Sequence, residues 1–134
     1  MTTWERVEAF ALTLPETTST PSYGGAPALR VNKSLFARLR GEMADDLDEL
    51  TGAPYGEVLM VGVGDLGTKE ALLASDPGAY FTVPHYDGYP AVLVRLAEAD
   101  EAEVRELLVE AWMRKAPKRA LRAYEETVGP LPGG

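Results

Sequence analysis

The chain has 134 residues, a formal net charge of −8, 46% hydrophobic residues and no cysteine, which together are typical of one globular domain. Without cysteine, disulfides, thiolate zinc sites, iron-sulfur clusters and cysteine nucleophiles are excluded. The first ten residues contain charged side chains and no apolar run, which speaks against a signal peptide or a membrane span, so we expect a cytoplasmic protein.

The acidity is confined to two short segments. Residues 42–49 and 98–110 each carry a net charge of −5, which leaves the rest of the chain at +2. An acidic balance argues against nucleic acid as a partner, because phosphate binders normally show a basic surface. Since the acids are concentrated in two places, that argument depends on where the two segments lie in the fold.

The N-terminal residues predict an amphipathic helix followed by an edge strand. Thr2 and Glu5 have the spacing of a capping box, and apolar residues then recur at helical spacing until Pro15. Residues 16–22 are polar and β-branched, which favours a short solvent-facing strand. Pro21 restricts that strand to the edge of a sheet, because proline donates no hydrogen bond.

A hairpin and an acidic connection follow. Residues 28–31 and 34–39 predict two strands joined at Asn32-Lys33, where asparagine tolerates the left-handed conformation of a tight turn. Residues 41–56 are acidic and contain several glycines and a proline. One or two helical turns over 44–50, a long loop and a mobile flap are all compatible with this connection.

The middle of the chain predicts three more strands and a short helix. Residues 57–63 form a near-continuous apolar run typical of a strand, and residues 65–75 predict a helix capped by Asp65. Two further strands are predicted over 79–83 and 89–96, separated by a loop that begins with proline and ends with glycine.

The C-terminal part is helical. Asp100 and Glu103 form a second capping box at the start of a helix, Pro117 marks a break, and one or two further helical turns follow. Residues 129–134 predict a disordered tail, so that residues 1–128 form the single domain. We expect an α+β fold in which N-terminal and C-terminal helices pack on one face of an antiparallel sheet of five to six strands.

One motif points to nucleotide binding. Residues 62–67 read G-V-G-D-L-G, follow a predicted strand and open a predicted helix, and Asp87 follows about twenty residues later. A dinucleotide-binding fold needs alternating strands and helices around a parallel sheet, whereas hairpins surround this segment. Asp65 also brings a carboxylate into the would-be anion site. We interpret the glycines as a strand end that leads into a capped helix.

The sequence predicts neither a catalytic nor a metal site. His85 is the single histidine, and no nucleophile-elbow motif accompanies it, so we interpret it as an ordinary loop residue. The acidic segments lack the spacing of a calcium-binding loop. We therefore expect a protein that is not an enzyme and that needs no cofactor or metal.

Basic residues form two sets that are suited to phosphate contact. Five cations follow the acidic helix within nine residues, and the helix dipole accounts for only the first two. A second set lies on the predicted hairpin. If both sets share a face, they form a phosphate-binding surface that does not read base sequence. The residues predicted to contact DNA phosphates are Arg30, Lys33, Arg38, Arg114, Lys115, Lys118, Arg119 and Arg122.

Short motifs recur in order along nearly the whole chain. They are LxLPET at 12–17, PALRV at 27–31, KxLFA at 33–37, LL at 72–73 ahead of a proline, YF at 80–81, VxVxL at 92–96, AW at 111–112 and APKxxL at 116–121. Their order and spacing resemble the MmcQ/YjbR family of small bacterial proteins. The resemblance implies a frataxin-like (CyaY-like) α+β domain, called a double wing, and a DNA-binding role that is itself a prediction for the family.

Two functional hypotheses follow. The first is weak, sequence-independent DNA binding through the basic residues. The alternative is a non-enzymatic module for a protein or a small molecule, in which Tyr80, Tyr86, Tyr89 and the loop 84–88 form an aromatic rim. Core packing is the competing explanation for Tyr80 and Tyr89. A concave pocket beside the loop supports the alternative, and a flat surface speaks against it.

Overall fold

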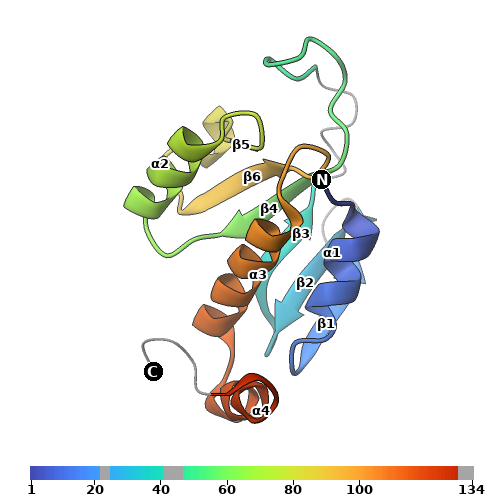
Figure 1. The fold of residues 1–134 in the computed structure, drawn as a ribbon, viewed down its shortest axis with the longest axis vertical. Coiled ribbons are helices and arrows are strands. Elements are labelled where there is room, and N and C mark those ends of the chain that lie inside the picture. Colours follow the sequence, from blue (N-terminus) through green and yellow to red (C-terminus); the bar gives the residue numbers. More distant parts are fainter. Residues whose placement is uncertain (22–24, 41–46, 130–134) are drawn as a thin grey trace.

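The computed structural model describes residues 1–21, 25–40 and 47–129, and it has an α+β architecture (Figure 1). Its elements are α1 (Trp4–Ala11), β1 (Thr17–Pro21), β2 (Pro27–Val31), β3 (Ser34–Leu39), β4 (Val58–Gly62), α2 (Leu66–Ser75), β5 (Tyr80–Phe81), the 3₁₀ helix η3 (Pro84–Tyr86), β6 (Ala91–Arg95), α3 (Glu101–Lys115) and α4 (Lys118–Val128). Within the described ranges the six strands form one antiparallel sheet in the order β1-β2-β3-β4-β6-β5. The predicted fold class is confirmed.

The main hydrophobic core lies between one face of the sheet and the helices α1 and α3. Because side chains alternate along a strand, Leu59 and Val61 of β4 face these helices, whereas Val58 and Met60 face the opposite side. Trp112 of α3 is fully buried in the main core. Helices α1 and α3 therefore cover one face of the sheet, as expected, and a smaller apolar cluster lies on the other face.

The hairpin β2–β3 forms as predicted. Asn32 and Lys33 both adopt left-handed backbone conformations, with φ of 49° and 68°. Two successive left-handed residues are typical of the type I′ turn, whose twist matches that of the strands it joins. The pairing of β2 with β3 shifts after Leu29, which leaves Phe36 as the extra residue of a β-bulge. The bulge directs Phe36 into the main core, where its side chain is 2% exposed.

The helix starts agree with the sequence prediction at two of three places. Asp65 accepts from the Thr68 N–H at 2.7 Å, and Asp100 caps α3 through the N–H of Ala102 at 2.8 Å. The prediction of Thr2 as the first cap is wrong. Thr2 is buried and donates its backbone N–H to Leu96, while Thr3 accepts from Arg6 and is the cap of α1.

The described part of the acidic connection, residues 47–56, is a turn held to the sheet by an ion pair. Arg95 binds the two carboxylate oxygens of Asp48 at 2.5 and 2.7 Å, and the two side chains are 11% and 5% exposed. The Arg95 guanidinium also lies 4.2 Å from the ring centroid of Phe81. The hydrogen bonds from Arg95 hold the pKa of Asp48 below its ordinary value.

Some sequence predictions concern residues outside the described ranges. These are the conformation of residues 41–46 and the tail over 130–134. Among the helices of the described residues, none has the length and apolar character required to cross a membrane.

Candidate nucleic-acid interface

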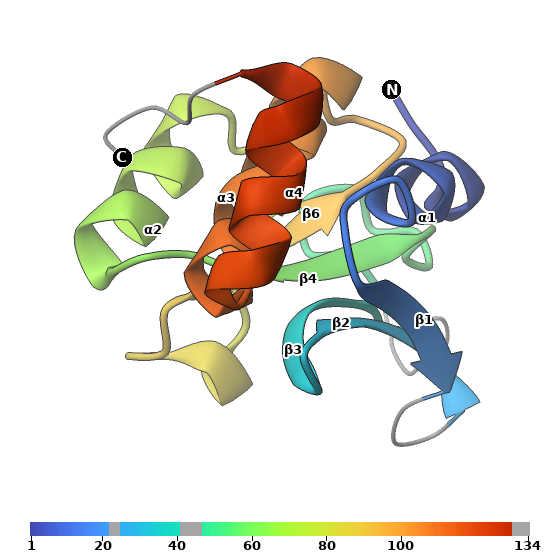
Figure 2. The same ribbon diagram turned by 90° about the horizontal axis from the view of Figure 1, so that it is seen from below.

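Six of the eight predicted phosphate-binding residues lie toward one end of the molecule, and the five of them that have no ion pair among the described residues form what we call the basic end. They come from the β2–β3 turn, the last turn of α3 and the first half of α4, three segments that lie in the lower part of Figure 1. Figure 2, which looks at this end, shows α4 lying over α3 with the hairpin beside them. The residues of the basic end are Lys33, Arg114, Lys115, Lys118 and Arg122.

A break at Pro117 divides the run of cations between two helices. Ala116 ends α3 in an extended conformation, and Pro117 precedes the first residue of α4. Arg114 and Lys115 therefore lie at the negative end of the α3 dipole, which stabilises them. Lys118, in contrast, lies at the positive end of the α4 dipole, which disfavours a cation. Packing of Tyr124 against Trp112, with ring centroids 5.2 Å apart, fixes α4 on α3.

Arg30 and Arg38 do not join the basic end. Arg30 pairs with Leu35 across the hairpin, and Arg38 pairs with Met60 of β4. Both partners lie on the sheet face away from α1 and α3, so the two arginines lie on that face as well. Arg30 donates to Thr20 Oγ1 at 3.4 Å on the neighbouring strand.

Arg119 lies on α4 but is engaged by a carboxylate. Its guanidinium binds Glu16, with the shortest contact at 2.7 Å, and this hydrogen-bonded pairing raises the pKa of Arg119. Glu16 has a left-handed backbone, with φ of 56°, in the turn that leads into β1. Trp112 donates its indole N–H to Pro15 in the same turn. Arg119 thus helps to hold this turn against α3 and α4.

The acidic residues at the start of α3 lie away from the basic end and are largely paired. Glu101 binds Arg6 at 2.7 Å and Arg105 at 2.8 Å. The hydrogen bond from Arg6 lowers the pKa of Glu101 to about 2. The N-terminal amino group donates to Ala99 nearby. The start of α3 and the 47–56 turn lie toward the end of the molecule where the N-terminus is, in the upper part of Figure 1, whereas α4 lies at the opposite end.

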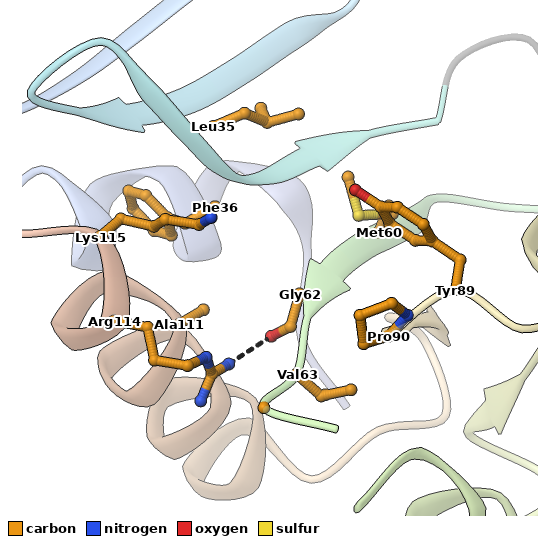
Figure 3. A pocket seen from close by; sticks show the side chains of 11 residues that line it. Leu35, Phe36, Met60, Gly62, Val63, Tyr89, Pro90, Ala111, Arg114 and Lys115 are labelled. Carbon is orange, nitrogen blue, oxygen red and sulfur yellow. Dashed lines mark hydrogen bonds between the residues drawn. The ribbon is translucent and has the colours of Figure 1, made fainter. Parts of the chain in front are cut away.

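A pocket of about 450 Å³ opens beside the basic end (Figure 3). Arg114 and Lys115 of α3 form one wall, and Tyr89 with Met60 forms the wall across from it. Arg114 donates to the carbonyl of Gly62 at 2.8 Å, which positions its guanidinium at the end of β4. Of the predicted aromatic rim only Tyr89 lines this pocket, and the sequence did not predict its other walls, because they come from segments far apart in the chain.

Two of the three glycines of the G-x-G-x-x-G motif line this pocket without forming a dinucleotide-binding turn. Gly62 and Gly64 belong to its lining, but the sheet around them is antiparallel. Asp65 accepts the N–H of Thr68, and this bond lowers the pKa of the Asp65 carboxyl. An ionised carboxylate therefore occupies the start of α2, where a dinucleotide phosphate would bind.

The three tyrosines of the aromatic region differ in burial. Tyr80 is buried in the main core, as the core-packing explanation predicted, and the burial raises its pKa. Tyr86 is also buried, in the smaller cluster. Core packing of Tyr89 is wrong: the side chain is 57% exposed, because Gly88 turns the chain with φ of 72° before β6 begins at Ala91.

A buried lysine fixes the backbone that carries Tyr89. Lys69 of α2 is 5% exposed, and its ammonium group donates to the carbonyls of Tyr86 at 2.6 Å and Tyr89 at 2.9 Å. The carbonyl of Tyr89 also accepts the N–H of Ala91 at 2.8 Å. Tyr89 therefore presents an exposed ring to the pocket from a backbone that is held in place.

Sequence comparison identifies relatives that cover almost the whole chain. A family model described as YjbR matches residues 12–114. Uncharacterised proteins of Mycobacterium tuberculosis and Mycobacterium bovis are 42% identical over 128 residues, which is 92% of this chain and 96% of each relative.

Comparison with solved structures supports the same fold. The crystal structure of a Deinococcus radiodurans protein with a DUF419 domain matches with a TM-score of 0.66 and 20% identity. The match covers 100% of this chain and 95% of that protein. At this identity the likeness concerns the fold alone.

Proposed function

The chain belongs to the YjbR family, and on that premise we propose that it is a weak DNA-binding protein without sequence preference, which acts by binding and not by catalysis. The observation that carries the proposal is the basic end. None of its five cations has a carboxylate partner within 4.0 Å among the described residues. A cation that no carboxylate neutralises keeps its charge and N–H groups available to phosphates.

The electrostatics of α4 support a role outside the folded chain. Lys118 and Arg122 lie in the first half of α4, and Glu125 and Glu126 lie in its last turn. Lys118 in the first turn and the two glutamates in the last turn oppose the helix dipole, and each placement is expected to cost a few tenths of a kcal/mol; Arg122, beyond the first turn, gains nothing from the dipole. Helix stability therefore does not account for the cations, whereas attraction of a polyanion does.

The nature of the cations supports contact with the backbone of DNA and not with its bases. Lysine and arginine at a hairpin turn and two helix ends provide point charges and forked donors for phosphate oxygens. Reading bases requires several side chains that enter a groove on one helix or strand pair, and α4 carries no asparagine or glutamine for adenine. We expect dissociation constants of about 10⁻⁴ to 10⁻⁶ M at physiological salt.

Fluorescence anisotropy with short labelled duplexes tests the proposal. We expect binding at low salt that weakens steeply as salt is added, with similar affinity for unrelated sequences. Reversing two charges in Lys118→Glu/Arg122→Glu removes about two phosphate contacts. The slope of log K against log salt, which is negative, is then expected to become shallower by about 2.

Arg30→Glu provides the matched control, because it reverses a cation on the far face of the sheet. We expect this variant to bind duplex within about twofold of the wild type, since screened charges on another face contribute little. Absence of duplex binding at low salt, or equal loss in the control and in the double variant, would refute the role of the basic end.

A further inference from the structure

The pocket beside the basic end joins two kinds of binding surface. Arg114 and Lys115 bring positive charge to one wall, and Tyr89 and Met60 bring aromatic and apolar surface to the other (Figure 3). A volume of about 450 Å³ falls within the range of small-molecule sites. Such a pocket matches a ligand with a flat ring at one end and an anionic group at the other.

The anionic group has defined partners in this pocket. The Asp65 carboxylate accepts the Thr68 N–H at the start of α2, so this helix end does not hold the anion of a ligand. Arg114 uses one nitrogen, Nη2, to bind Gly62, and its remaining N–H groups stay available among the described residues. Gly64 lies next to Arg114: a β-carbon at this position would be in van der Waals contact with Nη1, at 3.7 Å. Phosphate oxygens thus have a forked donor and the Lys115 ammonium as partners.

The ring has a defined partner as well. Tyr89 is exposed, yet its backbone is fixed by Lys69 and by the start of β6. An aromatic side chain on a fixed backbone loses little conformational entropy when a ring stacks on it. Stacking on an exposed tyrosine also tolerates any base, which agrees with binding that does not read sequence.

From this juxtaposition we infer that the pocket binds one nucleotide unit, with its base against Tyr89 and its phosphate on Arg114 and Lys115. The choice of a nucleotide rests on the proposed function. A free mononucleotide and an unpaired nucleotide of a single strand share this chemistry. Paired bases in a duplex cannot enter, because they remain stacked within the helix.

Binding of three probes tests the inference and separates its sources. The probes are a labelled homothymidine strand, the matching duplex, and thymidine monophosphate, the last followed by NMR shifts of the amides of Gly62 and Gly64. We expect Tyr89→Ala to weaken binding of the single strand about tenfold and to leave duplex binding unchanged. Tyr89→Phe, which keeps the ring, is expected to bind the strand like the wild type.

The outcomes distinguish this inference from the proposed function. Thymidine monophosphate that shifts these amides and loses affinity in Tyr89→Ala identifies a free nucleotide as ligand, even if duplex binding is absent. If Tyr89→Ala weakens binding of the single strand and thymidine monophosphate does not bind, the ligand is an unpaired nucleotide of a strand. Two results overturn the inference: inorganic phosphate binds as tightly as the mononucleotide, or Tyr89→Ala binds every probe like the wild type. Either result leaves duplex binding through Lys118, and with it the proposed function, untouched.

Discussion

The two ends of α3 differ in what their charged side chains contact. At its start, Asp100 accepts two backbone N–H groups and Glu101 binds two arginines. At its end, Arg114 donates to a backbone carbonyl, and Lys115 has no carboxylate partner among the described residues. The charges at the start therefore stabilise the fold, whereas those at the end remain available to a ligand.

The difference shows why net charge alone is a poor guide to partners. The chain carries −8 overall, yet among the described residues five of its 21 acids cap a helix or bind an arginine. An acid that is paired internally contributes little long-range field beyond its partner. The argument against polyanions from composition is therefore weaker at the basic end, which lies away from the paired acids (Figure 1).

The largest effect is expected where an ion pair is most buried. Asp48→Ala removes both oxygens that bind Arg95 and leaves a guanidinium that is 11% exposed without its counter-charge. We expect a loss of about 3 kcal/mol in the free energy of unfolding. Urea denaturation measures it as a lower midpoint with an unchanged slope.

The neighbouring acid is the matched control for Asp48. Glu49 is exposed and has no ion pair among the described residues, so Glu49→Ala is expected to change the free energy of unfolding by less than about 0.5 kcal/mol. Equal effects of the two substitutions would contradict the view that the pair with Arg95 anchors the 47–56 turn.

Lys69 tests whether partners, and not the sign of the charge, decide the role of a charged residue. It is a cation, but it is buried and donates to two carbonyls. Lys69→Met removes both hydrogen bonds and is expected to cost only about 1.5 kcal/mol, because each carbonyl keeps a backbone N–H donor, from Tyr89 and from Ala91. The backbone amides between Tyr86 and Ala91 are also expected to exchange hydrogen faster.

Glu70 provides the comparison for Lys69, because it is the next residue of α2 and is exposed. Glu70→Met is expected to leave both the unfolding midpoint and the exchange of these amides close to the wild type. If Lys69→Met behaves in the same way, Lys69 does not fix the backbone of Tyr89.

The pair of Glu101 with Arg6 predicts a smaller, pH-dependent effect. The pKa of Glu101 is about 2 in the folded chain against an ordinary value of 4.5. A carboxyl with a lowered pKa stabilises the fold above pH 4.5, and this contribution is lost as the pH falls toward 2. We expect the melting temperature of Glu101→Gln to lie below that of the wild type near neutral pH and to converge with it in acid.

Glu106 is the control on the same helix, exposed and without an ion pair among the described residues, and Glu106→Gln is expected to melt like the wild type at every pH. Thermal melts followed by circular dichroism at several pH values compare the three proteins. A gap between wild type and Glu101→Gln that stays constant down to the acid limit would show that the carboxylate charge is not what stabilises the start of α3.

Local patterns predicted most of the fold. The apolar run of β4, the turn at Asn32-Lys33 and the caps Asp65 and Asp100 depend on a few neighbouring residues, and all of them form as expected. The cap of α1, predicted at Thr2 and observed at Thr3, does not depend on neighbouring residues alone. The backbone N–H of Thr2 donates to the carbonyl of Leu96, which lies far along the chain, so Thr2 does not cap the helix.

The candidate site was harder to predict for the same reason. The sequence named the cations, but their faces depend on which side of the sheet α3 covers. Arg38 lies on the side away from α1 and α3, whereas Lys115 lines the pocket together with Phe36, whose ring a β-bulge places on the α3 side of the sheet. The sequence predicted Tyr89 as the first residue of a strand. It lies before the strand instead, where the turn at Gly88 leaves its side chain exposed.

The smallest predicted effect is the most specific to the basic end. Lys118 is the first residue of α4, where the helix dipole favours an anion, so Lys118→Glu is expected to raise the free energy of unfolding by about 0.5 kcal/mol. Lys115 is the last residue of α3, where the dipole favours a cation, so Lys115→Glu is expected to lower it by a similar amount. Both variants are expected to bind duplex DNA more weakly.

Urea denaturation and anisotropy on the same two proteins therefore separate the role in folding from the role in DNA binding, because DNA affinity falls in both variants while the free energy of unfolding moves in opposite directions. A loss of stability in both variants would mean that Lys118 supports the fold after all.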